Sequence, residues 1–215
     1  MTVLLFANGD LETITWIRPY LASASAVIAA DGGSRHLWRL EHLPDLVIGD
    51  MDSLPLQVRA WLAASNVPLI RHAREKDETD LELALLHAVA NYEDDVLVFG
   101  AFGGRLDQTL ANILLLSHPA LDTRRIELLA PHERAWLATA ETKIHGEIGD
   151  TVSLIPLGGD VLVRLATGLQ WILKEEVLAF GPARGVSNLM TAELANISVA
   201  SGTLLCIHTK RTWGR

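Results

Sequence analysis

The stretch Leu46-Val47-Ile48-Gly49-Asp50-Met51-Asp52-Ser53 begins as an apolar run and ends in a turn that carries two carboxylates. Its apolar part, Leu46–Ile48, is continuous rather than alternating, as is typical of a strand in a parallel sheet covered on both faces. A helical pattern follows at Leu54–Ala64, and Pro55 lies near its first turn, where proline is favoured. The stretch therefore predicts a strand, an acidic loop and a helix, the repeating unit of an open α/β sheet.

The same unit recurs through the first half of the chain. Further continuous apolar runs predict strands at Val3–Ala7, Ala26–Ala30, Pro68–Ile70, Val96–Phe99 and Ile126–Leu129. One helix is expected at Thr79–Asn91, because Thr79 and Glu82 have the spacing of a capping box. Another is expected at Asp107–Ser117, with Leu110 and Leu114 along one face. We therefore expect an open, mostly parallel α/β domain over residues 1–131.

The second half, from about Pro131, has a different pattern. Helical periodicity gives way to short strand-like runs at Ala135–Ala138, Val152–Ile155, Val161–Ala166, Val177–Phe180, Asn196–Val199 and Leu204–His208. Turn signals separate them at Gly149-Asp150, Gly158-Gly159-Asp160, Gly181-Pro182 and Ser201-Gly202. This alternation predicts an antiparallel β-sandwich domain over residues 132–215.

Composition narrows the classes of function. The formal net charge is -8, and a negative surface repels nucleic acids and anionic membranes, so we expect neither as a partner. The only cysteine, Cys206, lies in an apolar run, where a buried and inert thiol is expected. A single cysteine forms no intramolecular disulfide, and the first residues lack a basic leader. These features predict a cytoplasmic protein.

Acidic residues gather where the predicted strands of the first half end. Ligands of open α/β sheets bind beyond the carboxyl ends of the strands, so side chains at these ends share one edge. Carboxylates at this edge can bind Mg²⁺ together with the phosphates of a substrate. Glycines allow a phosphate to approach the backbone closely, and Arg105 can form a bidentate hydrogen bond with phosphate oxygens. The four loops are Asp31-Gly32-Gly33, Gly49-Asp50-Met51-Asp52-Ser53, Lys76-Asp77-Glu78-Thr79-Asp80 and Gly103-Gly104-Arg105-Leu106-Asp107-Gln108. Together they predict metal-assisted phosphoryl chemistry on a nucleotide.

Structural explanations exist for each of these loops taken singly. An aspartate after a strand is commonly a turn or cap residue, so Asp107 and Thr79 are alternatively helix caps and nothing more. The glycine pairs are alternatively tight turns. The G-x-x-x-x-G-K-[ST] loop and the G-x-G-x-x-G fingerprint of other nucleotide sites are both missing from the sequence. The prediction therefore depends on four such loops occurring together.

In order along the chain, these loops resemble the N-terminal domain of thiamine pyrophosphokinases. Pro44-Asp45-Leu46-Val47 extends the likeness upstream of Asp50. In the second half, Thr167-Gly168-Leu169-Gln170-Trp171-Ile172-Leu173 resembles the family's T-G-L-x-W-x-L segment, and Gly185-Val186-Ser187-Asn188 resembles its S-x-S-N segment. Gln170, Ile172 and Gly185 depart from the family's common residues, all on the thiamine side.

The resemblance implies an enzyme, a thiamine diphosphokinase. It implies that residues 1–131 bind ATP and Mg²⁺, and that residues 132–215 form a thiamine-binding and dimerisation domain. It further implies a homodimer whose active site combines the first domain of one subunit with the second domain of the other. The reaction would move the β,γ-diphosphate of ATP, the co-substrate, onto the hydroxyl of thiamine, giving thiamine diphosphate and AMP.

The resemblance also assigns roles to residues. It implies that Mg²⁺ is held by Asp50, Asp52 and Asp80, and that Arg105 and Asp107 complete the catalytic set. Asp31, Asp77 and Asp107 are implied to complete the metal shell or to orient Arg105, Lys76 or the thiamine hydroxyl. Residues implied on the nucleotide side are Asp31, Gly32, Gly33, Lys76, Asp77, Thr79, Gly104 and Gln108. Thiamine is implied to contact Trp171, Ser187 and Asn188.

Three alternatives remain open at the level of sequence. Trp171 is alternatively a core aromatic of the sandwich, since tryptophan is usually buried for packing. The protein is alternatively a pyrophosphokinase for another heterocyclic alcohol, such as a hydroxymethylpterin. A non-catalytic nucleotide-binding regulator is the third alternative, but it predicts the loss of loop aspartates or of Arg105, and none is missing.

Overall fold

The structure, a computed structural model, describes residues 1–138 and 140–211. The chain divides into two compact units, Met1–Pro131 (unit 1) and His132–Arg215 (unit 2). Each unit has its own hydrophobic core, and each is described by itself below.

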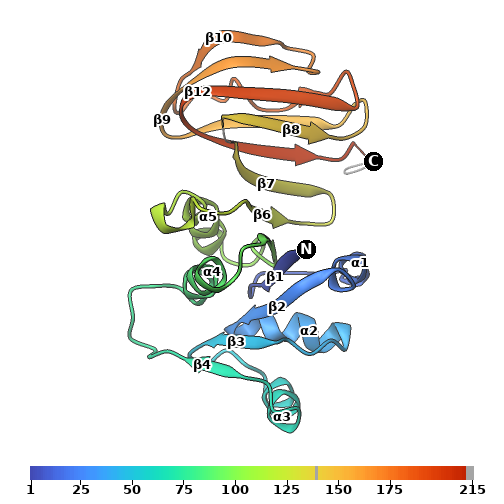
Figure 1. The fold of residues 1–215 in the computed structure, drawn as a ribbon, viewed down its shortest axis with the longest axis vertical. Helices are drawn as coiled ribbons and strands as arrows, with labels where there is room; N and C mark the ends of the chain where they lie inside the picture. The colour runs from blue at the N-terminus through green and yellow to red at the C-terminus, as the bar shows by residue number, and fades with distance from the viewer. Residues whose placement is uncertain (139, 212–215) are drawn as a thin grey trace. The chain divides into compact units, whose positions relative to one another are not determined.

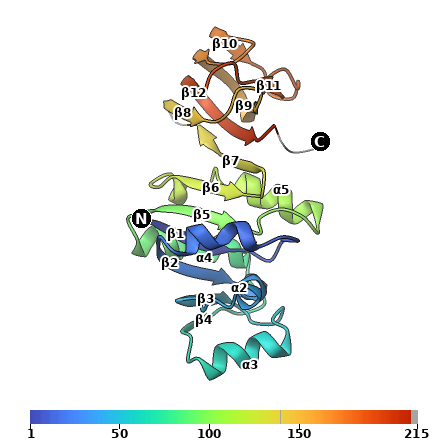
Figure 2. The same cartoon turned by 90° about the vertical axis from the view of Figure 1, so that its right-hand side faces the viewer.

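Unit 1 contains a six-stranded parallel sheet in the order β6-β5-β1-β2-β3-β4. Figure 2 shows these strands one after another in that order. Their bounds are β1 Thr2–Phe6, β2 Ala24–Ala30, β3 Leu46–Gly49, β4 Leu69–Arg71, β5 Asp95–Phe99 and β6 Ile126–Leu129. Each of them was predicted as a continuous apolar run, and the expectation of an open parallel α/β sheet is confirmed.

Helices cover both faces of this sheet. In Figure 1, α1, α2 and α3 lie on one side of the strands, and α4 and α5 on the other. Their bounds are α1 Arg18–Leu21, α2 Ser34–Leu40, α3 Leu56–Ala64, α4 Asp80–Asn91 and α5 Leu106–Leu115. Short 3-10 turns are η1 Thr15–Ile17, η2 Asp31–Gly33 and η3 Pro119–Leu121. The chain moves from β1 through β2 and β3 to β4, then returns to β5 on the other side of β1, so the order of strands reverses at β1 and β5.

Local signals account for where the helices begin. The Thr79 hydroxyl accepts a hydrogen bond from the Glu82 N–H at 3.1 Å, so Thr79 is the N-cap of α4 as its spacing predicted. Pro55 is the N-cap of α3 rather than a residue of its first turn. In α5 the predicted apolar face is wrong, because Leu110 and Leu114 are exposed. The buried side chain is Asn112, whose Nδ2 donates to the Ala101 carbonyl at 2.8 Å and ties the helix to the loop after β5.

Unit 2 is a sandwich built largely from two long, bent strands, β9 (Thr151–Thr167) and β12 (Leu194–Thr209). The second half of β12 pairs with β7 (Glu133–Ala138) and the first half of β9, which also pairs with β11 (Asn188–Leu189). The first half of β12 pairs with β8 (Glu141–His145) and the second half of β9, which also pairs with β10 (Leu173–Leu178). All of these pairings are antiparallel, so the predicted β-sandwich is confirmed.

Two of the predicted turns in unit 2 are not chain reversals. Gly158-Gly159-Asp160 and Ser201-Gly202 lie inside β9 and β12, where both strands bend from one layer of the sandwich into the other. Glycine permits such a bend as readily as a tight turn, because it has no Cβ to oppose a positive φ. The local signal was therefore read correctly as irregular backbone but wrongly as the end of a strand.

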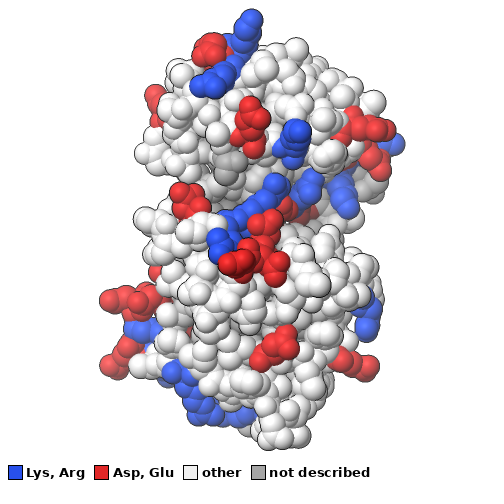
Figure 3. All heavy atoms as spheres, in the orientation of Figure 1, with Lys and Arg blue, Asp and Glu red and all other residues white. Residues whose placement is uncertain are grey.

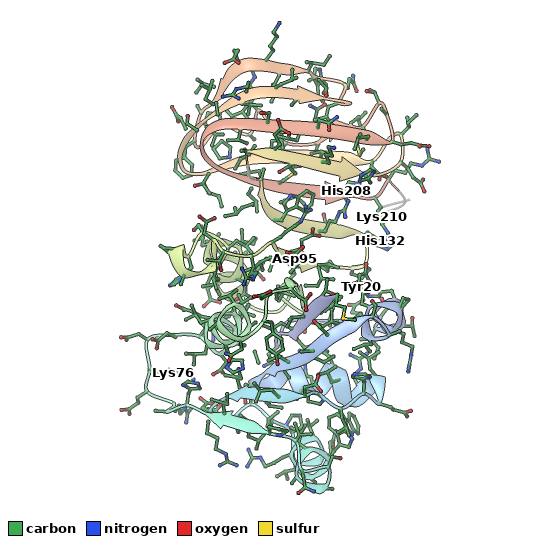
Figure 4. All side chains as sticks on the ribbon, viewed as in Figure 1. Tyr20, Lys76, Asp95, His132, His208 and Lys210 are labelled. Carbon is green, nitrogen blue, oxygen red and sulfur yellow. The ribbon has the colours of Figure 1, made fainter. Side chains whose placement is uncertain are left out.

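The sandwich has an apolar core with side chains from both layers, and it also contains a buried polar network around His208. Cys206 is buried in the core, as its apolar context predicted. Figure 4 labels His208 on β12, and its Nε2 lies 2.8 Å from the Asp150 carboxylate. The Arg134 guanidinium donates to Nδ1 of His208 at 3.2 Å, so Nε2 carries the proton and donates to Asp150. Burial lowers the pKa of His208, which keeps this ring neutral and structural at pH 7.

The surface carries mixed charge on the face shown in Figure 3. Acidic and basic side chains both occur there. Among the described residues, no helix has both the length and the apolar character needed to cross a membrane.

Candidate active site

A cavity of about 400 Å³ opens in unit 1 where the strand order reverses. Its walls come from the loops after β1, β2 and β5 and from the first turns of α4 and α5. In parallel α/β sheets this crevice is the usual ligand site, because neighbouring loops diverge there. The predicted residues that line it are Asp31, Thr79, Asp80, Gly104, Arg105 and Gln108.

Three aspartates lie close together beside this cavity. Ligand oxygens of Asp31, Asp50 and Asp52 are all within 4.8 Å of one another. Asp31 follows β2 and the other two follow β3, and these adjacent parallel strands end at the same edge. The Asp50 Oδ1 accepts from the Asp52 N–H at 2.9 Å, and this hydrogen bond lowers the pKa of Asp50.

Asp31 is the most constrained member of the cluster. It is only 3% exposed, and its Oδ2 accepts a 3.3 Å hydrogen bond from the Ser53 N–H. Its Oδ1 is buried and finds no hydrogen-bond donor among the described residues. Burial raises the pKa of the Asp31 carboxyl, and the charges of Asp80 and Asp50 raise it further. A buried carboxylate oxygen without a donor, beside two more carboxylates, fits a divalent cation such as Mg²⁺.

Asp80 lies close to Asp31, and the loop before Asp80 supplies the positively charged side chain of Lys76. A Cβ on Gly49 would lie 2.7 Å from Asp31 Cβ and 3.1 Å from Asp80 Oδ1, so glycine is needed for these aspartates to approach. Lys76 Nζ lies 2.7 Å from Asp80 Oδ1, and Figure 4 labels Lys76 on the loop between β4 and α4. Arg74 pairs with Asp52 at 3.1 Å. The structure therefore surrounds the carboxylate cluster with side chains that offset its charge.

Arg105 and Asp107 lie on the exposed rim. The Arg105 Nε and Nη2 donate to the two oxygens of Asp107 at 3.1 and 2.5 Å, and this pairing lowers the pKa of Asp107. Gly103 and Gly104 before them both have positive φ, 84° and 67°, which a glycine adopts without strain. An exposed guanidinium fork at the mouth of a cavity is suited to phosphate oxygens.

Other predicted residues have different surroundings. Gly32 and Gly33 are buried beneath the chain leaving β1, where a Cβ would lie 2.4 Å from Asn8 Cγ and 1.9 Å from the Phe6 carbonyl oxygen respectively. Their visible role is thus close packing of β1 against η2. Asp77 is exposed on the loop before α4, outside the cavity lining.

The loop Asn8-Gly9-Asp10 lines the cavity and was missed by the sequence reasoning. It is held to the loop after β5 by hydrogen bonds from the Gly9 N–H to the Gly100 carbonyl (2.7 Å) and from the Asp10 N–H to the Phe102 carbonyl (2.9 Å). Its signal was available, because an Asn-Gly turn directly follows the first apolar run and so occupies one more strand end.

In unit 2, the predicted thiamine residues form a local arrangement of their own. Trp171 is 57% exposed, which excludes the alternative that it is a core aromatic. Asn188 is buried, and its side-chain amide accepts from the Trp171 N–H at 3.0 Å and donates to the Trp171 carbonyl at 2.7 Å. Ser187 is exposed beside it with φ of 60°. Asn188 therefore holds the backbone that presents the Trp171 ring.

Comparison with known families gives a match for each unit. The profile described as "Thiamin pyrophosphokinase, catalytic domain" matches residues 17–128, and "Thiamin pyrophosphokinase, vitamin B1 binding domain" matches residues 141–204. The resemblance predicted from the sequence is thus confirmed.

Individual relatives agree with these profiles. The chain is 28% identical to "Thiamine pyrophosphokinase" of Bacillus subtilis, over 97% of this chain and 98% of that protein. It is 30% identical to "Thiamine pyrophosphokinase 1" of Arabidopsis thaliana, over 86% of this chain and 78% of that protein. The crystal structure of the Bacillus subtilis protein superposes with a TM-score of 0.88, covering 98% of this chain and 99% of that chain at 28% identity.

Proposed function

Because the chain belongs to the thiamine pyrophosphokinase family, we propose that it transfers the β,γ-diphosphate of ATP to the hydroxyl of thiamine. The hydroxyl oxygen of thiamine bonds to the β-phosphorus, and the bond from that phosphorus to the oxygen shared with the α-phosphorus breaks. The products are thiamine diphosphate, AMP and the hydroxyl proton.

The observation that supports this proposal most directly is the carboxylate cluster beside the switch point of the sheet. Asp31, Asp50 and Asp52 place oxygens within 4.8 Å of one another, next to the cavity that Asp31, Asp80 and Arg105 line. Transfers of this kind need positioning and neutralisation of charge more than covalent help from the protein.

We assign Mg²⁺ to Asp50, Asp52 and Asp80, and the closeness of Asp31 to Asp50 and Asp52 supports Asp31 as a further ligand. Magnesium bound there would neutralise phosphate charge and connect the carboxylates to phosphate oxygens. Lys76, now paired with Asp80, is near enough to contribute a positive charge to the same place.

Arg105 is assigned to the transferring group. Its fork now binds the Asp107 carboxylate, and a phosphate would take the place of that carboxylate. Asp107 would orient the guanidinium while no phosphate is bound. Thr79, Gly104 and Gln108, which line the same cavity, are assigned to the nucleotide.

Thiamine is a cation, and the exposed face of Trp171 suits a thiazolium ring. Such a cation–π contact contributes roughly 0.5–2 kcal/mol. We assign Ser187 to a hydrogen bond with the aminopyrimidine, and Asn188 to the support of Trp171. We further propose a homodimer in which Trp171 of one subunit serves the carboxylate cluster of the other.

We also propose that the enzyme works in the cytoplasm. Its one cysteine, Cys206, is buried and forms no intramolecular disulfide, which fits a reducing compartment.

The test is to incubate the purified protein with ATP, Mg²⁺ and thiamine and to measure AMP and thiamine diphosphate. Equal amounts of both products, lost in Asp50→Asn and without added Mg²⁺, are the expected result. A hydroxymethylpterin in place of thiamine tests the alternative substrate, and turnover only with that alcohol would overturn the assignment. Nucleotide binding without either product would favour a non-catalytic regulator.

A further inference from the structure

The two carboxylates after β3 are separated by a residue in a strained conformation. Met51 has φ of 67°, in the left-handed region that side chains other than glycine rarely adopt. Its neighbours are Asp50 and Asp52, whose oxygens belong to the carboxylate cluster. The left-handed residue makes the chain turn back sharply enough for the Asp52 N–H to reach Asp50 Oδ1 at 2.9 Å. The position of the pair therefore depends on the conformation of Met51.

Two contacts hold Met51 in this conformation. Its side chain is only 5% exposed and packs in the core with Leu54, Val58 and Leu62. Its carbonyl oxygen accepts a hydrogen bond from Arg59 Nη2 at 2.6 Å. Arg59 lies in α3, eight residues further along the chain, so the helix that follows the turn also fixes the turn. Strained residues persist where their surroundings over-determine them, and they concentrate at functional sites.

We propose that Arg59 is a positioning residue for the divalent-metal site, acting through the Met51 carbonyl on the geometry of Asp50 and Asp52. This inference rests on the metal assignment in the proposed function. Arg59 touches neither the metal nor the substrates in this role. Groups that orient metal ligands in this way commonly change metal affinity about 10–100-fold when they are removed.

A purely electrostatic role for Arg59 predicts the opposite sign. A guanidinium near a cluster of carboxylates repels a cation, so replacing it with a neutral side chain should tighten metal binding. Positioning predicts weaker binding, because the two carboxylates lose their common orientation. The direction of the change in affinity therefore distinguishes the two roles without any measurement of turnover.

The experiment is a titration of purified full-length protein with Mn²⁺, followed by electron paramagnetic resonance of the free ion. We expect Arg59→Met, which keeps an aliphatic stem but loses the donor, to weaken Mn²⁺ binding on the order of 10–100-fold. Arg59→Lys keeps the charge without the planar fork and should give a smaller loss. If Arg59→Met does not fold, Arg59→Lys alone carries the comparison with wild type.

A matched control is Arg124→Met. Arg124 also donates to backbone carbonyls, those of Tyr92 and Thr123, but it lies before β6 at the opposite ends of the strands. Its replacement should leave Mn²⁺ affinity unchanged.

The outcomes separate this inference from the metal assignment beneath it. Suppose that wild type binds Mn²⁺ and that Asp50→Asn removes this binding. If Arg59→Met then binds Mn²⁺ as tightly as wild type, or more tightly, the positioning role is overturned and the metal site stands. If wild type binds no Mn²⁺, or if Asp50→Asn does not weaken Mn²⁺ binding, the metal site and the inference are both overturned. An equal loss in Arg124→Met would also overturn the inference, because the effect would then be general to arginine removal.

Discussion

At the scale of single residues, the proposed catalytic residue Arg105 is oriented by an ion pair rather than by burial. Its side chain is 73% exposed, and it is held by Asp107 two residues further on. Little packing is therefore lost when it is replaced, since exposed substitutions usually change stability by less than about 0.5 kcal/mol. Catalysis and stability can consequently be measured separately at this position.

We expect Arg105→Lys to lower kcat on the order of 10–100-fold, because a point charge does not reproduce the planar fork that stabilises a transferring phosphoryl group. The melting temperature should change little. Both quantities are measured on one preparation. Arg125→Lys is the matched control, since Arg125 pairs with Glu127 at the same spacing of two residues and should leave kcat unaltered. A loss of thermal stability without a loss of rate would make Arg105 structural.

His36 is a buried side chain that contacts the cavity loop Asn8-Gly9-Asp10. It is 1% exposed, and its Nε2 lies 2.9 Å from the Gly9 carbonyl. Burial lowers the pKa of His36 to about 4, aided by the charges of Arg35 and Arg39 and opposed by Asp10. In the unfolded chain the pKa is near 6.5. Between these values the unfolded state binds a proton that the folded state does not, so stability falls as the pH falls.

From this difference we expect wild type to lose about 2 kcal/mol more unfolding free energy than His36→Gln between pH 7.5 and pH 5. Carboxylates and the other histidines titrate in both proteins and cancel in the comparison. Urea unfolding at several pH values measures it. Parallel curves for the two proteins would show that His36 takes up a proton in the folded state as readily as in the unfolded chain.

At the scale of elements, the sequence predicted those strands that consist of one continuous apolar run. Each strand of unit 1 is such a run and was found, whereas β8 (Glu141–His145) was missed because only Ile144 among its buried positions is apolar. The loops of the candidate site were found through their aspartates. Asp31 was placed on the nucleotide side, where it was expected to complete the metal shell or to orient a neighbouring group. Its closeness to Asp50 and Asp52 depends on the distance between the ends of β2 and β3, which pairing determines and sequence spacing does not.

Glycines at the bends of β9 and β12 give a graded prediction at this scale. Gly159→Ala should be nearly neutral, because a Cβ there meets open space. Gly158→Ala should cost about 1–2 kcal/mol, because its φ is 73° although space is open. Gly202→Ala should cost more, since φ is 90° and a Cβ would lie 2.6 Å from the Asp160 carbonyl oxygen. Denaturant unfolding ranks the three, and equal costs at 158 and 202 would refute the close approach.

At the scale of the whole molecule, the proposed chemistry divides between the two units. Unit 1 carries the carboxylates and Arg105, and unit 2 carries Trp171 on a loop braced by Asn188. Neither unit alone holds all the groups that we assign to the proposed reaction. If the proposed homodimer shares its sites, a lesion in one unit of one subunit can be bypassed by its partner, whereas two lesions in one site cannot.

Mixed dimers of Asp50→Ala and Trp171→Ala test this sharing. Each pure mutant should be inactive or strongly impaired. Unfolding and refolding them together in equal amounts makes about half of the dimers mixed, and each mixed dimer has one intact site and one doubly damaged site. Roughly a quarter of wild-type activity should therefore return. If every site lies within one subunit, each site in the mixture carries one lesion, and no activity returns even when mass measurements confirm mixed dimers. That result would sink the shared site while leaving the assigned reaction intact.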